Sequence, residues 1–80
     1  MGDVKEDRLL DASGLSCPMP VVRAGQAMRG MSPGQVLRII ATDRGSLADI
    51  PAWAEDTGNE LLFTSDEGAR FVFLVRKGAE

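Results

Sequence analysis

The chain has 80 residues, of which 44% are hydrophobic and 26% are charged, and its net charge is -3. This length and composition predict one globular domain rather than two domains or a disordered chain. The acidic balance and the scarcity of aromatic residues argue against a nucleic-acid partner, because phosphate binding needs a basic surface. The apolar runs are too short to span a bilayer and the start does not resemble a signal peptide. We therefore expect a cytoplasmic protein without a membrane partner.

The residue types that are missing narrow the possible chemistry further. The chain has no histidine and a single cysteine, Cys17. It therefore lacks a histidine base, and it cannot form an internal disulfide or a CxxC metal site. The missing ligands predict that no metal is bound. Nothing resembles the glycine-rich phosphate-binding patterns GxxxxGK[ST] or GxGxxG, so we expect no nucleotide cofactor, and no cofactor of another kind is indicated. Any chemistry must come from Cys17, the carboxylates, the cationic side chains or the backbone.

The first elements are a tail, a strand and a helix. Residues 1–7 are polar and predict an N-terminal tail, because they have little to bury. Residues 8–12 form a short apolar run that predicts a strand. Apolar residues between Val21 and Met28 then recur at helical spacing. Two prolines before them suit the first turn of a helix, and Gly30 is a plausible end for it.

The middle of the chain predicts a second strand and a second helix. Residues 36–42 are rich in β-branched side chains, which favours a well-buried strand. The segment 46–57 has apolar residues on one helical face, but Pro51 is unfavourable inside a helix. Two arrangements fit. Either Asp49 caps the helix and Pro51 lies in its first turn, or Ser46 begins a helix that kinks.

The last part of the chain predicts a β-hairpin. Residues 61–64 and 71–75 are strand-like, and turn-forming residues join them. The resulting order, β-α-β-α-β-β, favours an α+β two-layer sandwich with a four-stranded mixed sheet and two helices on one face. A single domain would span residues 8–78, with residues 79–80 as a C-terminal tail.

Alternation along the last strand divides its side chains between two faces. If Phe71, Phe73 and Val75 face the helices, Val72 and Leu74 lie on the open face of the sheet. Single exposed apolar residues on such a face are normal in soluble proteins.

Cys17 is the strongest candidate for a functional residue. It directly precedes Pro18, Met19 and Pro20 at the start of the first helix. A helix start favours anions, so the thiol pKa should fall, and the Met19 and Val21 N–H groups could point at the sulfur. Gly14 would let the preceding loop turn sharply enough to present the thiol. The alternative is a small buried hydrophobic residue, which is the usual role of a free cysteine.

The residues around Cys17 resemble a known family. The segment 10–20 is similar to the signature of the TusA (SirA-like) sulfur-carrier family, whose hallmark is Cys-Pro-x-Pro. The similarity continues in one register, in the segments 31–34, 42–43, 49–53, 58–61 and 75–78. The family fold is a β-α-β-α-β-β two-layer sandwich, in agreement with the order predicted above.

The resemblance implies a sulfur relay. Cys17 would accept a sulfane sulfur as a persulfide from a cysteine desulfurase or a rhodanese-like donor. It would pass this sulfur to an acceptor protein of the DsrE/TusD-like kind or similar, in tRNA thiolation, sulfur oxidation or cofactor biosynthesis. Some relatives have a second cysteine where this chain has Ala54. Cys17 therefore cannot release sulfur through an internal disulfide, and we expect a monomeric, sulfurtransferase-type carrier without autonomous turnover.

Three charged residues are weaker candidates for partner binding or thiolate stabilisation. Arg23 is the nearest basic residue along the first helix, but a solvated helix charge is the favoured explanation for it. Asp43 and Arg44 follow the second strand, where the carboxyl ends of parallel strands would bring them near Cys17. Their loop could equally be a helix cap. For Trp53, core packing is favoured over a partner contact.

An alternative function belongs to a different class. The chain could be a non-catalytic protein-interaction or regulatory module in which Cys17 is structural and the open sheet face binds a partner. A thiol oxidoreductase is disfavoured, because the chain has neither a resolving cysteine nor a histidine.

Overall fold

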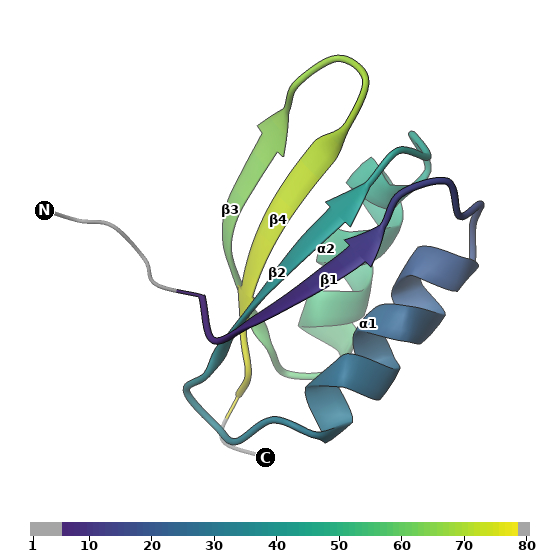
Figure 1. The fold of residues 1–80 in the computed structure, drawn as a ribbon. Coiled ribbons are helices and arrows are strands. Elements are labelled where there is room, and N and C mark those ends of the chain that lie inside the picture. Colours follow the sequence, from purple (N-terminus) through teal and green to yellow (C-terminus); the bar gives the residue numbers. More distant parts are fainter. Residues whose placement is uncertain (1–5, 79–80) are drawn as a thin grey trace, which may run out of the picture.

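The structure is a computed structural model that describes residues 6–78, and it has the predicted element order (Figure 1). The elements are β1 (Arg8–Ala12), α1 (Met19–Arg29), β2 (Val36–Ala41), α2 (Ser46–Asp56), β3 (Glu60–Asp66) and β4 (Phe71–Arg76). Neither helix among residues 6–78 has the length and apolar character needed to cross a lipid bilayer.

The four strands form one mixed sheet in the order β1-β2-β4-β3. Strands β1 and β2 are parallel, whereas β4 runs antiparallel to both of its neighbours. Both helices cover the same face of the sheet, so the predicted α+β two-layer sandwich is confirmed (Figure 1). Because β1 and β2 are parallel, the β1–α1 and β2–α2 connections lie together at one end of the sheet.

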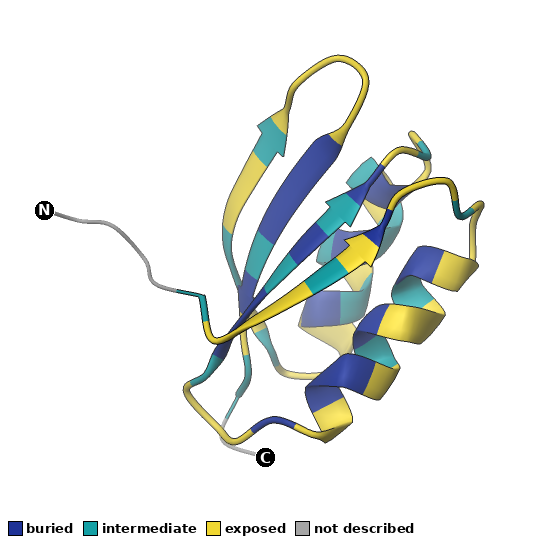
Figure 2. Cartoon of the chain, in the orientation of Figure 1, coloured by how far each residue is buried: buried dark blue, intermediate teal, exposed yellow. Residues whose placement is uncertain are grey.

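The core lies between the sheet and the helices. Phe71, Phe73 and Val75 are at most 1% exposed and pack in this core, as the alternation along β4 predicts (Figure 2). The helices contribute smaller buried side chains, among them Ala24 and Ile50. A small residue such as Ala24 lets helix and sheet approach closely, which suits a domain of this size.

The open face of the sheet is less exposed than the sequence suggests. Val72 is only 3% exposed and Leu74 is half-buried. Val72 lies in a central strand, with Ile40 beside it on β2 and Ser65 beside it on β3, and this position explains its burial. Larger exposure occurs at the edge strands, where Phe63 is 50% exposed.

The second helix begins at Ser46 and contains Pro51 in its interior. The alternative in which Asp49 caps the helix is therefore wrong. Ser46, Ile50 and Ala54 are the buried residues of α2, and their spacing of four places them on one stripe that runs past the proline. The free energy gained by burying this stripe against the sheet is larger than the cost of the backbone hydrogen bond that Pro51 cannot donate.

The end of α2 shows why the hairpin starts where it does. Gly58 has a φ of 75°. Its N–H donates to the Glu55 carbonyl at 3.2 Å, and the Asn59 N–H donates to the Ala54 carbonyl at 2.8 Å. This is a Schellman ending, for which glycine is the favoured residue. Strand β3 follows at once, so it is longer than the predicted segment 61–64 and contains a register shift between Leu61 and Phe63.

Two residues of the expected N-terminal tail contact the sheet. The Asp7 N–H donates to the Val36 carbonyl, and the Val36 N–H donates to the Asp7 carboxylate, both at 2.8 Å. Glu6 pairs with Arg38 at 3.2 Å. Residues 1–5 of the expected tail, and the C-terminal residues 79–80, lie outside the described residues.

We expect the two faces of the sheet to differ sharply in their contribution to stability. Phe73→Ala should lower the free energy of unfolding by about 3–5 kcal/mol, because it opens a cavity in the core. The matched variant Phe63→Ala removes a half-exposed ring and should cost about 1 kcal/mol or less. Urea unfolding of both variants measures the difference. Equal losses would contradict this placement of the core.

Candidate functional site

The connection between β1 and α1 is tied to the end of β2. Gly14 has a φ of 81°, a conformation that favours glycine, and the chain reverses there. The Gly14 N–H donates to the Thr42 hydroxyl at 2.8 Å, and Thr42 directly follows β2. The Leu15 N–H donates back to the Ala12 carbonyl at 3.2 Å. These contacts position the loop that presents Cys17.

Cys17 is exposed and lies between the first turns of the two helices. It directly precedes Pro18, the N-cap of α1, and the peptide bond between them is cis. Its N–H donates to the Asp43 carboxylate at 3.3 Å, and its Sγ donates to Asp49 Oδ2 at 2.6 Å. The prediction that the loop after the second strand lies near Cys17 is therefore confirmed.

Gly45, the N-cap of α2, leaves room for this arrangement. A Cβ atom at this position would lie 3.7 Å from the Cys17 Cβ atom and only 2.9 Å from Asp43 Oδ2. A side chain there would thus press on the carboxylate that accepts the Cys17 N–H. The contact with Cys17 itself would be an ordinary van der Waals distance, so a larger residue at position 45 would act on the site mainly by displacing Asp43.

The surroundings raise the pKa of the Cys17 thiol. The largest cause is the hydrogen bond to Asp49, followed by loss of solvent contact and by the negative charges of Asp49 and Asp43. The prediction of a lowered thiol pKa is therefore wrong. The part of that prediction that concerns Met19 fails at the helix start, because the Met19 N–H donates to the Ser16 carbonyl at 2.8 Å instead of pointing at the sulfur. Pro18, just before it, has no N–H to offer.

An open groove between the helices starts at Cys17. It encloses about 390 Å³. Its lining residues come from the start of α1 and one side of α2: Cys17, Pro18, Val21, Asp49, Ala52, Trp53 and Asp56. The Trp53 ring is half-buried against the core, so packing, as predicted, and groove lining coexist in one residue. An incoming segment could reach the sulfur along this groove.

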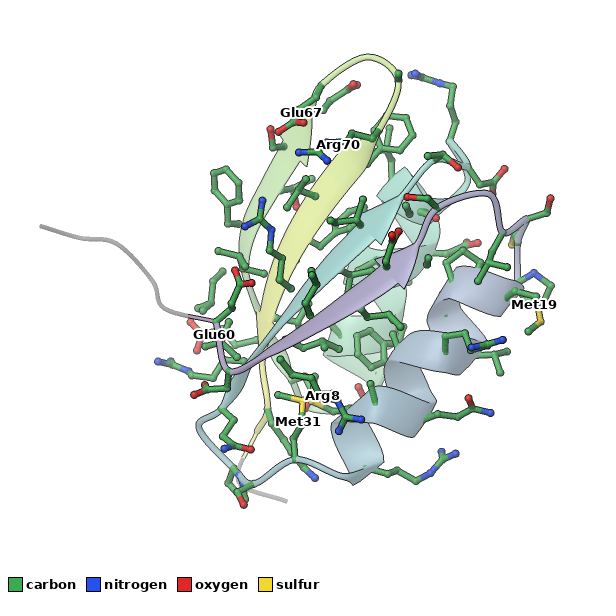
Figure 3. The ribbon with its side chains drawn as sticks, in the orientation of Figure 1. Arg8, Met19, Met31, Glu60, Glu67 and Arg70 are labelled. Carbon is green, nitrogen blue, oxygen red and sulfur yellow. The ribbon has the colours of Figure 1, made fainter. Side chains whose placement is uncertain are left out.

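The other candidate residues are spread around the site. Pro20 is buried, whereas Met19 is 38% exposed and points away from the sheet (Figure 3). The Arg44 guanidinium lies over the Phe71 ring, 5.6 Å from its centroid. Arg23 lines a different hollow, with residues of β1. The structure thus brings Asp43 to Cys17, and it directs both arginines elsewhere.

Asp49 is the residue that the sequence analysis underestimates. It is considered there only as a helix cap, yet it contacts the sulfur. The sequence does contain a signal, because Asp49 is the acidic residue in the first turn of α2, whose start lies at the same end of the sheet as Cys17. Within residues 6–78, no three His, Cys, Asp or Glu side chains gather in a way that could hold a metal ion.

Replacing Asp49 should make Cys17 more acidic. Asp49→Asn removes a negative charge and the carboxylate that favours the protonated thiol, so the thiol pKa should fall. Asp43→Asn should lower it less, because Asp43 acts only through its charge on the sulfur. The pH dependence of iodoacetamide alkylation measures both, since the thiolate is the reactive form. An unchanged or raised pKa in Asp49→Asn would contradict the role of the hydrogen bond.

Comparisons with known proteins identify the family of the chain. The family model described as sulfurtransferase TusA matches residues 8–77. Sulfur carrier protein TusA of Allochromatium vinosum is 54% identical over 71 residues, which cover 89% of this chain and 93% of the relative. Sulfur carrier protein TusA of Pseudomonas putida is 39% identical over 80 residues and covers 100% of both chains.

A solved structure shows the same fold. The crystal structure of a SirA-like protein from Desulfitobacterium hafniense superposes with a TM-score of 0.76 at 24% sequence identity. The match covers 89% of this chain and 97% of the other. The resemblance noted from the sequence is thus confirmed, and the chain belongs to the TusA family.

Proposed function

We propose that this protein is a sulfur carrier that binds sulfane sulfur as a persulfide on Cys17. The observation that supports this most is the placement of the only cysteine. It is exposed, it lies at the end of an open groove, and a carboxylate contacts its sulfur. Relatives that align with nearly the whole chain are named sulfur carriers.

The transfer is an exchange of sulfur between thiols. During loading, Cys17 Sγ attacks the outer sulfur of a donor persulfide, and the donor S–S bond breaks with its electron pair leaving on the donor cysteine. During unloading, an acceptor thiolate attacks the outer sulfur on Cys17, and Sγ is the leaving group. Neither step needs an external oxidant or reductant, because the sulfane sulfur moves without a net change in oxidation state.

The partners are proteins that present a sulfur atom to the groove. We assign the donor to the cysteine desulfurases or rhodanese-like proteins and the acceptor to DsrE/TusD-like or similar proteins. Because Cys17 is the only cysteine of the chain, a second thiol must come from the partner at each step. We propose that the carrier acts as a monomer, which supplies the one thiol that each exchange takes from this protein.

The alternative of an interaction module with a structural cysteine has less support. A structural cysteine should pack in the core, as most free cysteines do. Cys17 is instead exposed, and the core cluster of the described residues does not include it. The open sheet face does expose Phe63, but this residue lies far along the chain from the site and explains nothing about Cys17.

Mass spectrometry tests the proposal directly. After incubation with a cysteine desulfurase and cysteine, the wild-type protein should gain the mass of one sulfur atom, and a reductant should remove it. Cys17→Ser should gain none, although its fold and thermal stability should stay close to wild type because residue 17 is exposed. If neither a desulfurase nor a rhodanese adds sulfur to the wild-type protein, the carrier function is wrong.

A further inference from the structure

The contact between Cys17 and Asp49 creates a problem that the sulfur transfer must solve. Sγ donates its proton to Asp49 Oδ2 at 2.6 Å, so the resting residue is a thiol rather than a thiolate. A thiol is a weak nucleophile, and the sulfur of a weakly acidic thiol is a poor leaving group. Loading is therefore slow as long as Sγ keeps its proton. Unloading is slow as long as the departing Sγ has no proton to take up.

We propose that Asp49 is a catalytic residue that takes the proton from Cys17 Sγ during loading and returns it during unloading. This inference rests on the proposed sulfur-carrier function. A carboxylate within hydrogen-bond distance of the reacting atom meets the geometric requirement for a general base and, once protonated, for a general acid.

The proton and electron balance is complete. In loading, the Sγ–H bond breaks toward Asp49 while Sγ bonds to the outer sulfur of the donor persulfide. The donor S–S bond breaks, and the donor cysteine leaves with the electron pair and takes a proton from solvent. In unloading, an acceptor thiolate bonds to that outer sulfur, and the bond from Sγ to it breaks. Sγ leaves with the electron pair and receives, through Asp49, the proton that the acceptor thiol released when it became a thiolate.

The fold holds the two groups in a fixed relation. Asp49 lies in the first turn of α2, whose buried stripe packs on the sheet, so its backbone belongs to a rigid element. The Cys17 N–H is anchored on the Asp43 carboxylate at 3.3 Å. The two carboxylates therefore have different tasks. Asp43 holds the backbone of Cys17, and Asp49 faces its sulfur.

The experiment uses a small donor, so that protein docking does not enter. Wild type, Asp49→Asn and the control Glu55→Gln are loaded with glutathione persulfide and unloaded with dithiothreitol, and mass spectrometry follows both rates. Glu55 is an exposed acidic residue of the same helix, so its variant removes an equal charge away from the sulfur. Iodoacetamide alkylation of the same samples reports thiolate formation without need of a base.

The two roles open to Asp49 predict different results. If Asp49 transfers the proton, the loading rate of Asp49→Asn divided by its alkylation rate should fall on the order of 10²-fold below the wild-type ratio, because the variant gains thiolate but loses the base, and unloading should also slow. The control should match wild type in all three reactions. An unchanged ratio of loading to alkylation would overturn the proposal, because Asp49 would then only suppress the thiolate. If the wild-type protein itself accepts no sulfur, the carrier function fails, and this proposal fails with it.

Discussion

The parallel pairing of β1 with β2 is the constraint on which the rest of the structure depends. It requires a crossover after β1, and β3, which runs parallel to β2 because both are antiparallel to β4, requires a second crossover after β2. Both crossovers are helices on the same face, so both helices begin at one end of the sheet. Cys17 precedes the first of these helices, Asp43 lies in the loop before the second, and Asp49 lies in the first turn of the second. Three residues separated by up to 32 positions in the chain thus meet around one sulfur atom.

The helix start and the Asp49 carboxylate have opposite effects on the pKa of that thiol, and the positions of their polar atoms decide which effect is larger. A helix start attracts negative charge, but the effect comes from free N–H groups and weakens at an exposed, solvated position. Around Cys17 these groups are scarce, because Pro18 has none and the Met19 N–H is already bonded. The Asp49 carboxylate touches the thiol directly, and contact with a full charge outweighs a distant partial one. The acidic neighbour therefore prevails, and the thiol pKa rises.

Patterns local in sequence predicted most of this fold, and contacts distant in sequence account for the rest. The element order, the inward face of β4 and the place of Cys17 before the first helix all follow from residues near one another in the chain. The start of α2 could not be predicted from nearby residues. It depends on whether the free energy gained by burying Ser46, Ile50 and Ala54 against the sheet exceeds the cost of Pro51 inside the helix, and that burial is visible only in the folded structure. The hydrogen-bond partner of the thiol could not be predicted either, because Asp49 reaches Sγ only once two separate loops come together.

The raised thiol pKa gives an exposed carrier cysteine a property that burial would otherwise provide. Oxidation and alkylation require the thiolate, so a thiol that keeps its proton resists both even when solvent reaches it. Burial would give the same protection but would also exclude a partner's sulfur. A carboxylate beside Cys17 protects the thiol without burying it, so a partner can still reach the sulfur while its unselective reactivity falls. The chain has no second cysteine with which an oxidised Cys17 could form an internal disulfide, so the retained proton is the protection that the site itself supplies.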